Sequence, residues 1–200
     1  MIKSFLIAAM VLCFSTAANA QKSPDEFLIA LMEQARELPT DNNSCTEDLL
    51  TLVRNNFDIE IMGRFILGRY WRKATYKQQE EFLDIFEKST TKRFAPMLKD
   101  IPPDSFNITK IESQVNDILI YSTFQSNNNT VKIKWRLRRN VHHQDVVDYP
   151  KWPEYKIIDI VAGGISLALT LRAEYNTIIA YQGIEGLISE LQKKLEKNDS

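Results

Sequence analysis

The amino-acid sequence predicts an α+β fold in which helices cover one face of a twisted antiparallel sheet of about four strands. Two observations support this prediction. Apolar residues recur with the helical period of about 3.6 up to Pro102 and Pro103, and with the strand period of 2 from Phe106 to Arg139. Beyond a glycine pair at 163–164, the helical period returns. Helices first, strands next and helices last are typical of an α+β domain.

Four helices are expected ahead of the sheet. The sequence Ser-Pro-Asp-Glu at 23–26 is a capping box with proline at the first helical position, and Ser44 to Glu47 repeats the capping box. Asp58 is suited to cap a third helix. Thr75 with Gln78 forms another capping box, which begins a long helix. The proline pair then ends this helix, because proline cannot donate to the hydrogen-bond ladder.

Three consecutive strands are expected to form an antiparallel meander. They are joined at 116–117 and 127–129, where asparagines tolerate the positive φ of tight hairpins. A longer loop leads to a fourth strand, and after the glycine pair a helix over about 166–181 and a second helix to about Glu196 follow on either side of Gly183. The four strands are Phe106 to Val115, Ile118 to Ser126, Thr130 to Arg139 and Tyr155 to Val161.

The third of these strands shows the clearest pattern in the chain. Its apolar and basic residues alternate strictly, and side chains alternate between the two faces of a strand. One face is therefore expected to lie against the helices and the other to face solvent. The same alternation fits a filled core and the wall of a cavity. The apolar residues are Val131, Ile133, Trp135 and Leu137, and the basic residues are Lys132, Lys134, Arg136 and Arg138.

The N-terminal residues 1–20 are expected to be a secretory signal peptide. Lys3 supplies the positive charge, Phe5 to Phe14 form the apolar run, and Ala18-Asn19-Ala20 form the cleavage site. The apolar run is about half of the ~20 residues that span a bilayer. Residues 21–200 are expected to form a single domain.

The composition argues against an internal disulfide and against nucleic-acid binding. Removal of the signal peptide leaves Cys45 without a partner for an internal disulfide. The 25 basic and 26 acidic residues nearly balance, which argues against nucleic acid as a partner.

Two segments resemble a known family when they are taken together. Leu67 to Phe82 has the sequence LGRYWRKATYKQQEEF, and Gly164 to Leu167 has the sequence GISL. In this order behind an export signal, they resemble the MlaC family of periplasmic phospholipid-binding proteins, also called the toluene-tolerance family. The resemblance covers about Asp58 to Leu191. It implies an apolar lipid cavity between the sheet and the helices, which holds the acyl chains while the head group stays exposed.

The resemblance further implies a periplasmic carrier that shuttles a phospholipid between outer- and inner-membrane complexes and so maintains outer-membrane lipid asymmetry. The implied partners are the phospholipid, an inner-membrane ABC transporter complex with a ring-forming lipid-binding subunit, and an outer-membrane lipoprotein-porin complex. No cofactor, metal ion or catalytic residue is expected. The residues expected to bind lipid are Phe65, Ile66, Tyr70, Trp71, Phe82, Phe86, Ile118, Ile120, Val131, Ile133, Trp135, Ile158, Ile160, Ile165, Leu167 and Leu171.

Four arginines and lysines beside the aromatic cluster allow two interpretations. Their side chains suit either contact with a lipid phosphate or ordinary ion pairs and solvated helix faces. These residues are Arg64, Arg69, Arg72 and Lys73.

Three alternatives to the phospholipid carrier stay open. The first is a periplasmic binding protein for another apolar ligand, such as a hopanoid or fatty acid, and the second is an adaptor protein with a solid core. The third is a hydrolase, because Ser166 lies between a strand and a helix, as in a nucleophile elbow. However, Ala168 stands where the elbow has glycine, and His142 and His143 precede the serine instead of following it. We therefore expect no enzymatic activity.

Overall fold

The computed structural model of the chain describes residues 23–38, 45–99, 105–126, 129–139 and 154–197. The expected signal peptide at 1–20 and the two histidines of the 140–153 loop lie outside these residues. Within the described part of the chain, none of the helices combines the length and apolar character that a bilayer span requires.

Predicted capping residues begin three of the helices in the first half of the chain, and Ser44, the predicted cap of the second helix, lies outside the described residues. The Glu26 carboxylate accepts a 2.8 Å hydrogen bond from the Ser23 backbone N–H, and Asp58 accepts the N–H three residues further on at 2.9 Å. Thr75 and Gln78 bond reciprocally, at 2.8 and 3.3 Å. The predicted starts of these three helices are therefore confirmed. The elements are α1 (Pro24–Glu37), α2 (Cys45–Asn56), α3 (Ile59–Leu67), the 3₁₀ helix η1 (Gly68–Lys73) and α4 (Tyr76–Lys99).

The sheet is antiparallel and has five strands in the order β1-β2-β3-β4-β5. This confirms the predicted α+β fold and its meander, and adds one strand of two residues that the sequence analysis missed. β1 lies at one edge and carries a bulge between Ile108 and Lys110. The strands are β1 (Asn107–Ser113), β2 (Asp117–Ser126), β3 (Asn129–Arg139), β4 (Tyr155–Ala162) and β5 (Ile165–Ser166).

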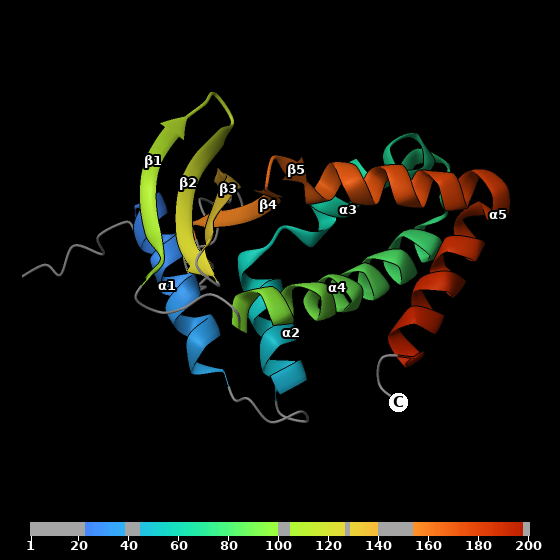
Figure 1. Cartoon of the computed structure of the whole chain (residues 1–200). Helices are drawn as coiled ribbons and strands as arrows, with labels where there is room; N and C mark the ends of the chain where they lie inside the picture. The colour runs from blue at the N-terminus through green and yellow to red at the C-terminus, as the bar shows by residue number, and fades with distance from the viewer. Residues whose placement is uncertain (1–22, 39–44, 100–104, 127–128, 140–153, 198–200) are drawn as a thin grey trace, which may run out of the picture.

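The C-terminal helix α5 (Leu167–Lys197) is broken at Gly183, as the sequence predicts. Gly183 has φ 73° and ψ −179°, a backbone conformation that glycine adopts at little cost. The break divides α5 into a first arm at 167–182 and a second arm at 184–197. Figure 1 shows the second arm turning away sharply from the first, with α4 running alongside.

The core lies between the inner face of the sheet and the helices. Trp135 and Ile120 of the sheet and Phe82 and Phe86 of α4 are fully buried. The alternation of β3 accounts for this arrangement, because Ile133, Trp135 and Leu137 point inward while the basic residues between them are exposed or half-buried. Figure 1 shows the sheet at one end of the molecule, with α3, α4 and α5 extending away from it.

Candidate functional site

The structure brings most of the predicted lipid-binding residues into one apolar interior. Ten of the sixteen are buried, nine of them in the core, and four more are partly buried against the core, namely Tyr70, Trp71, Val131 and Leu167. The tenth, Ile158, is buried outside this core. Phe65 and Ile165, which are 40% and 68% exposed, lie at the surface. The ten buried residues are Ile66, Phe82, Phe86, Ile118, Ile120, Ile133, Trp135, Ile158, Ile160 and Leu171.

The strand register aligns the sheet side of this interior. Ile120 pairs with Trp135, and the neighbouring pairs continue the apolar face in both directions. The Trp135 indole N–H donates a 2.8 Å hydrogen bond to the Ser122 hydroxyl, so its one polar group is satisfied in the core. In β4, Ile160 lies opposite Trp135.

Aromatic rings form the helix side of the interior. The rings of Phe82 and Phe86 stack with their centroids 5.5 Å apart, and Tyr175 of α5 meets Phe82 edge-on at 6.3 Å. Asn176 ties α5 to α3 through a 2.9 Å hydrogen bond to the Ile66 carbonyl. The helices and the sheet thus share one continuous apolar interior, which the described side chains close to solvent.

Two clefts among the described residues lie at the border of this interior. The first, of about 430 Å³, lies at the β1–β2 hairpin and includes one predicted lipid-binding residue, Ile118. The second, of about 250 Å³, lies between α4 and the two arms of α5, and Tyr175 forms part of its wall. Neither of these two clefts is the lipid cavity between sheet and helices that the family resemblance implies.

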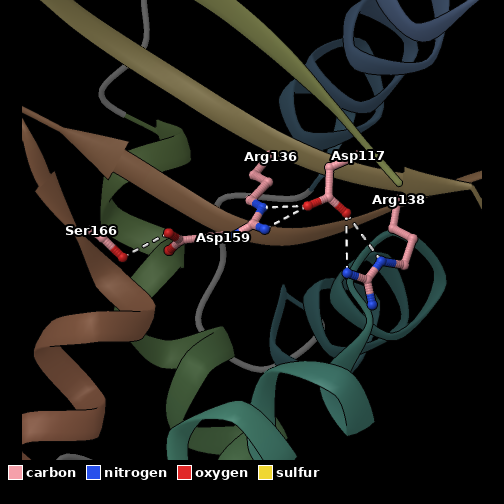
Figure 2. A network of polar contacts seen from close by, with 5 residues as sticks. All are labelled: Asp117, Arg136, Arg138, Asp159 and Ser166. Carbon is pink, nitrogen blue, oxygen red and sulfur yellow. Dashed lines mark hydrogen bonds and ion pairs between the residues drawn. The ribbon is translucent and has the colours of Figure 1, made fainter. Parts of the chain in front are cut away.

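The outer face of the sheet carries an ion cluster around one buried carboxylate, drawn in Figure 2. Asp117 is 5% exposed and accepts hydrogen bonds from Arg136 Nε at 2.8 Å and from Arg138 Nε and Nη2 at 3.1 Å each. A carboxylate binding two guanidinium groups fixes how β2 and β3 align at this end. Two of the five basic residues of β3 are thus ion-pair partners as well as surface charges.

We predict that Asp117→Ala lowers the free energy of unfolding by about 1–2 kcal/mol. Its loss leaves two guanidinium groups without their anion, but Arg136 and Arg138 are 44% and 37% exposed, so water replaces much of the interaction. Urea denaturation measures the change. Asp84→Ala, which breaks an exposed pair with Lys88, is the control and should change stability by less than about 0.5 kcal/mol. Equal losses in both variants would contradict the prediction.

Ser166, the last residue of β5, directly precedes α5 and is held by hydrogen bonds to its neighbours. Its hydroxyl donates to Asp159 at 2.6 Å, as Figure 2 shows. The same hydroxyl accepts the Leu169 N–H at 3.1 Å. Asp159 also accepts the Ala168 N–H at 3.0 Å. These bonds satisfy free N–H groups of the first helical turn. Ser166 therefore caps the N-terminus of α5. Across the described ranges there is also no group of three His, Cys, Asp or Glu side chains that could hold a metal.

The arginines of the Leu67 to Phe82 segment and its flank lie on the surface. Arg64 pairs with Glu60 at 3.3 Å and lies 5.9 Å from the Trp71 ring centroid, and Arg69 donates to the Tyr70 hydroxyl at 2.9 Å. These local contacts favour the ion-pair and surface interpretation over a buried phosphate clamp.

A further arginine, Arg172 of α5, was not singled out by the sequence analysis. Its guanidinium donates to the Phe65 carbonyl at 3.0 Å and lies 4.9 Å from the Phe65 ring centroid. Arg172 therefore joins α5 to α3 beside the surface-exposed Phe65.

Sequence reasoning also missed the α4–α5 cleft. Its residues come from segments about 80–100 positions apart, so no local pattern predicts their meeting. Burial raises the pKa of Tyr175 to about 12, and the nearby Glu174 carboxylate adds to this effect. The cleft residues are Ser89, Lys92, Arg93, Glu174, Tyr175, Leu191, Lys194 and Leu195.

Comparisons with known proteins give one family. The family model described as MlaC protein matches residues 21–193. A curated protein of Haemophilus influenzae, the intermembrane phospholipid transport system binding protein MlaC, is 24% identical over 96% of this chain and 90% of its own length.

A solved structure has the same fold. It is that of a phospholipid-binding protein from Ralstonia solanacearum in complex with a phospholipid. It superposes with a TM-score of 0.70 over 92% of this chain and 100% of the other, at 18% identity.

Proposed function

Because the chain belongs to the MlaC family, we propose that it is a periplasmic carrier that binds one phospholipid by its acyl chains. It moves the lipid between outer- and inner-membrane complexes and so maintains the lipid asymmetry of the outer membrane. Support comes from the Haemophilus relative, which is named as a phospholipid transport system binding protein, and from the Ralstonia protein of the same fold, which holds a phospholipid.

The observation that carries the proposal is the continuous apolar interior between β2–β4 and α3–α5. Residues such as Phe82 of α4 and Trp135 of β3 face it from opposite sides and are fully buried. We propose that the predicted lipid-binding residues contact the acyl chains there. Phe65 and Ile165, being exposed, would lie at the rim.

The hydrophobic effect explains why such a carrier needs a fully apolar site. Each methylene group transferred out of water gains about 0.8 kcal/mol, so two acyl chains with about thirty methylenes gain on the order of 24 kcal/mol. Transfer from a bilayer into a matching apolar site is then nearly neutral, because the tails are already out of water. Direction must come from partners, and no nucleotide site is needed in the carrier itself.

Loading requires the closed interior to open. The side chains of Phe82, Phe86 and Tyr175 pack on one another in the described conformation. The acyl chains therefore enter only if the helices move away from the sheet. We propose that Gly183, which separates the two arms of α5, is the joint at which the second arm moves.

Location and partners complete the proposal. Cleavage of residues 1–20 would release the protein into the periplasm, as a single domain at 21–200. The inner-membrane partner would be an ABC transporter complex with a ring-forming lipid-binding subunit, and the outer-membrane partner a lipoprotein-porin complex.

Mass spectrometry of the native protein tests the function. We expect organic extraction of protein purified from the periplasm of an expressing bacterium to release close to one two-tailed phospholipid per chain. A periplasmic protein of unrelated fold, purified in parallel, controls for lipid that is carried over. A hopanoid or a fatty acid would support the alternative ligand class, and extraction of no lipid above the control would contradict the carrier.

A further inference from the structure

Three helical segments, which side chains hold together, line the α4–α5 cleft. Lys92 of α4 donates a 3.0 Å hydrogen bond to the Leu195 carbonyl in the second arm of α5. Lys194 of the second arm pairs with Glu174 of the first arm at 3.1 Å. The cleft therefore has defined walls, although its residues are far apart in sequence.

The charge of the cleft favours an anion. Three cations, Lys92, Arg93 and Lys194, line it against one carboxylate, that of Glu174, which gives a formal charge of +2. Arg93 has an exposed side chain and acts electrostatically on the Tyr175 hydroxyl, which places its guanidinium near the buried phenol. A guanidinium group binds phosphate oxygens with two parallel hydrogen bonds.

Neutral donors complete this set. The Ser89 hydroxyl oxygen is buried and has no hydrogen-bond partner among the described residues. A buried hydroxyl without a partner is destabilising and is rare in folded proteins, so a missing partner is expected at this point. The phenol of Tyr175 stays protonated across the physiological pH range and therefore remains a donor.

Tyr175 also connects the cleft to the apolar interior. Its side chain lines the cleft, and its ring packs edge-on against Phe82. The cleft volume of about 250 Å³ lies below the roughly 300–1,000 Å³ of sites for drug-sized ligands. The cleft thus suits a small charged group, with apolar tails continuing past Tyr175 into the interior.

We propose that the α4–α5 cleft binds a phosphate group. Arg93 and Lys194 neutralise its charge, and Ser89 and Tyr175 donate hydrogen bonds to its oxygens. The phosphate belongs either to the head group of a lipid whose tails lie in the interior, which rests on the proposed function, or to free phosphate.

Binding of soluble short-chain lipids tests the site. We expect calorimetry to show that the native protein binds dihexanoylphosphatidylglycerol at least about tenfold more tightly than dihexanoylglycerol, which has the same tails and no phosphate. Arg93→Ala/Lys194→Ala should remove this difference. The matched control is Lys88→Ala/Lys193→Ala, which removes the same charge from exposed positions on the same two helices and should keep the difference. Equal affinities for the phosphatidylglycerol in the two double variants would overturn the proposal.

Ser89→Ala separates binding from stability. We expect this variant to bind dihexanoylphosphatidylglycerol several-fold more weakly with no fall in melting temperature, since the hydroxyl has no partner to lose. A lower melting temperature with unchanged affinity would count against the site.

Titration with inorganic phosphate distinguishes the source of the group. Binding of inorganic phosphate that the Arg93/Lys194 variant loses assigns a site for free phosphate, whereas binding of the phosphatidylglycerol alone assigns a head-group site. If the native protein binds inorganic phosphate, the Arg93/Lys194 variant does not, and neither short-chain lipid binds, the phosphate site stands and the carrier function fails. If both lipids bind equally to every variant, the carrier function stands and the phosphate site is overturned.

Discussion

Phe82→Ala is expected to lower the free energy of unfolding by about 3–5 kcal/mol, the usual cost of removing a buried phenylalanine ring. Phe82 is fully buried and packs against Phe86 and Tyr175. On the α3 side, Gly63 lies so close that a Cβ there would be 3.1 Å from the Phe82 ring. With rings and backbone on several sides, the surroundings cannot collapse fully into the space left by the ring. Urea denaturation of the lipid-free protein measures the loss.

Tyr181→Ala is the control for this variant. It removes an aromatic side chain that is 86% exposed on α5, and should change stability by about 0.5 kcal/mol or less. A loss below about 1 kcal/mol for Phe82→Ala would mean that a hollow already adjoins the ring, and so that the lipid-free interior is not closed.

The second large effect is a loss of stability at high pH that depends on Tyr175. Burial raises the pKa of this phenol from 10.0 to about 12, so the folded state binds more protons than the unfolded state between these values. Stability from this group is fully present below pH 10 and is lost as pH rises towards 12. A difference of about two pKa units corresponds to roughly 2–3 kcal/mol.

Urea denaturation at intervals from pH 9 to pH 12 isolates this contribution. Tyr175→Phe lacks the titrating hydroxyl. Between pH 9 and pH 12, its free energy of unfolding should therefore fall by roughly 2–3 kcal/mol less than that of the native protein. Tyr181→Phe, at an exposed position, should follow the native curve. Parallel curves for the native protein and Tyr175→Phe would show that the phenol is not buried in solution.

Local patterns predicted the parts of the fold that are decided locally. The alternation of Val131 to Arg138 gave the correct inner face of β3, and Asp58 caps α3 as expected. Asp117 shows the limit of such reasoning. Its asparagine–aspartate sequence predicted a turn, yet Asp117 begins β2, where it pairs with Arg138 of β3. Arg136 and Arg138 also bind its carboxylate. A pattern over a few positions does not predict contacts with residues that are 19–21 positions away.

The site was harder to predict than the fold. Periodicity identifies an inward-facing residue such as Ile133, but gives the same pattern for a filled interior and a lipid cavity. The α4–α5 cleft depends on Gly183, which returns Lys194 towards Glu174 of the first arm. The glycine predicted a break in the helix. The angle of the break, and therefore the meeting of these charges, comes from packing.

The two edges of the sheet affect how readily the protein aggregates at high concentration. At one border, β1 has the bulge near Lys110, and the ion pair between Lys110 and Glu112 adds charge there. At the other border, β5 has two residues. Irregular, charged or very short borders are poor templates for another chain to extend strand by strand. Among the described strands, β1 and β5 are therefore poor templates for the growth of fibrils between crowded molecules.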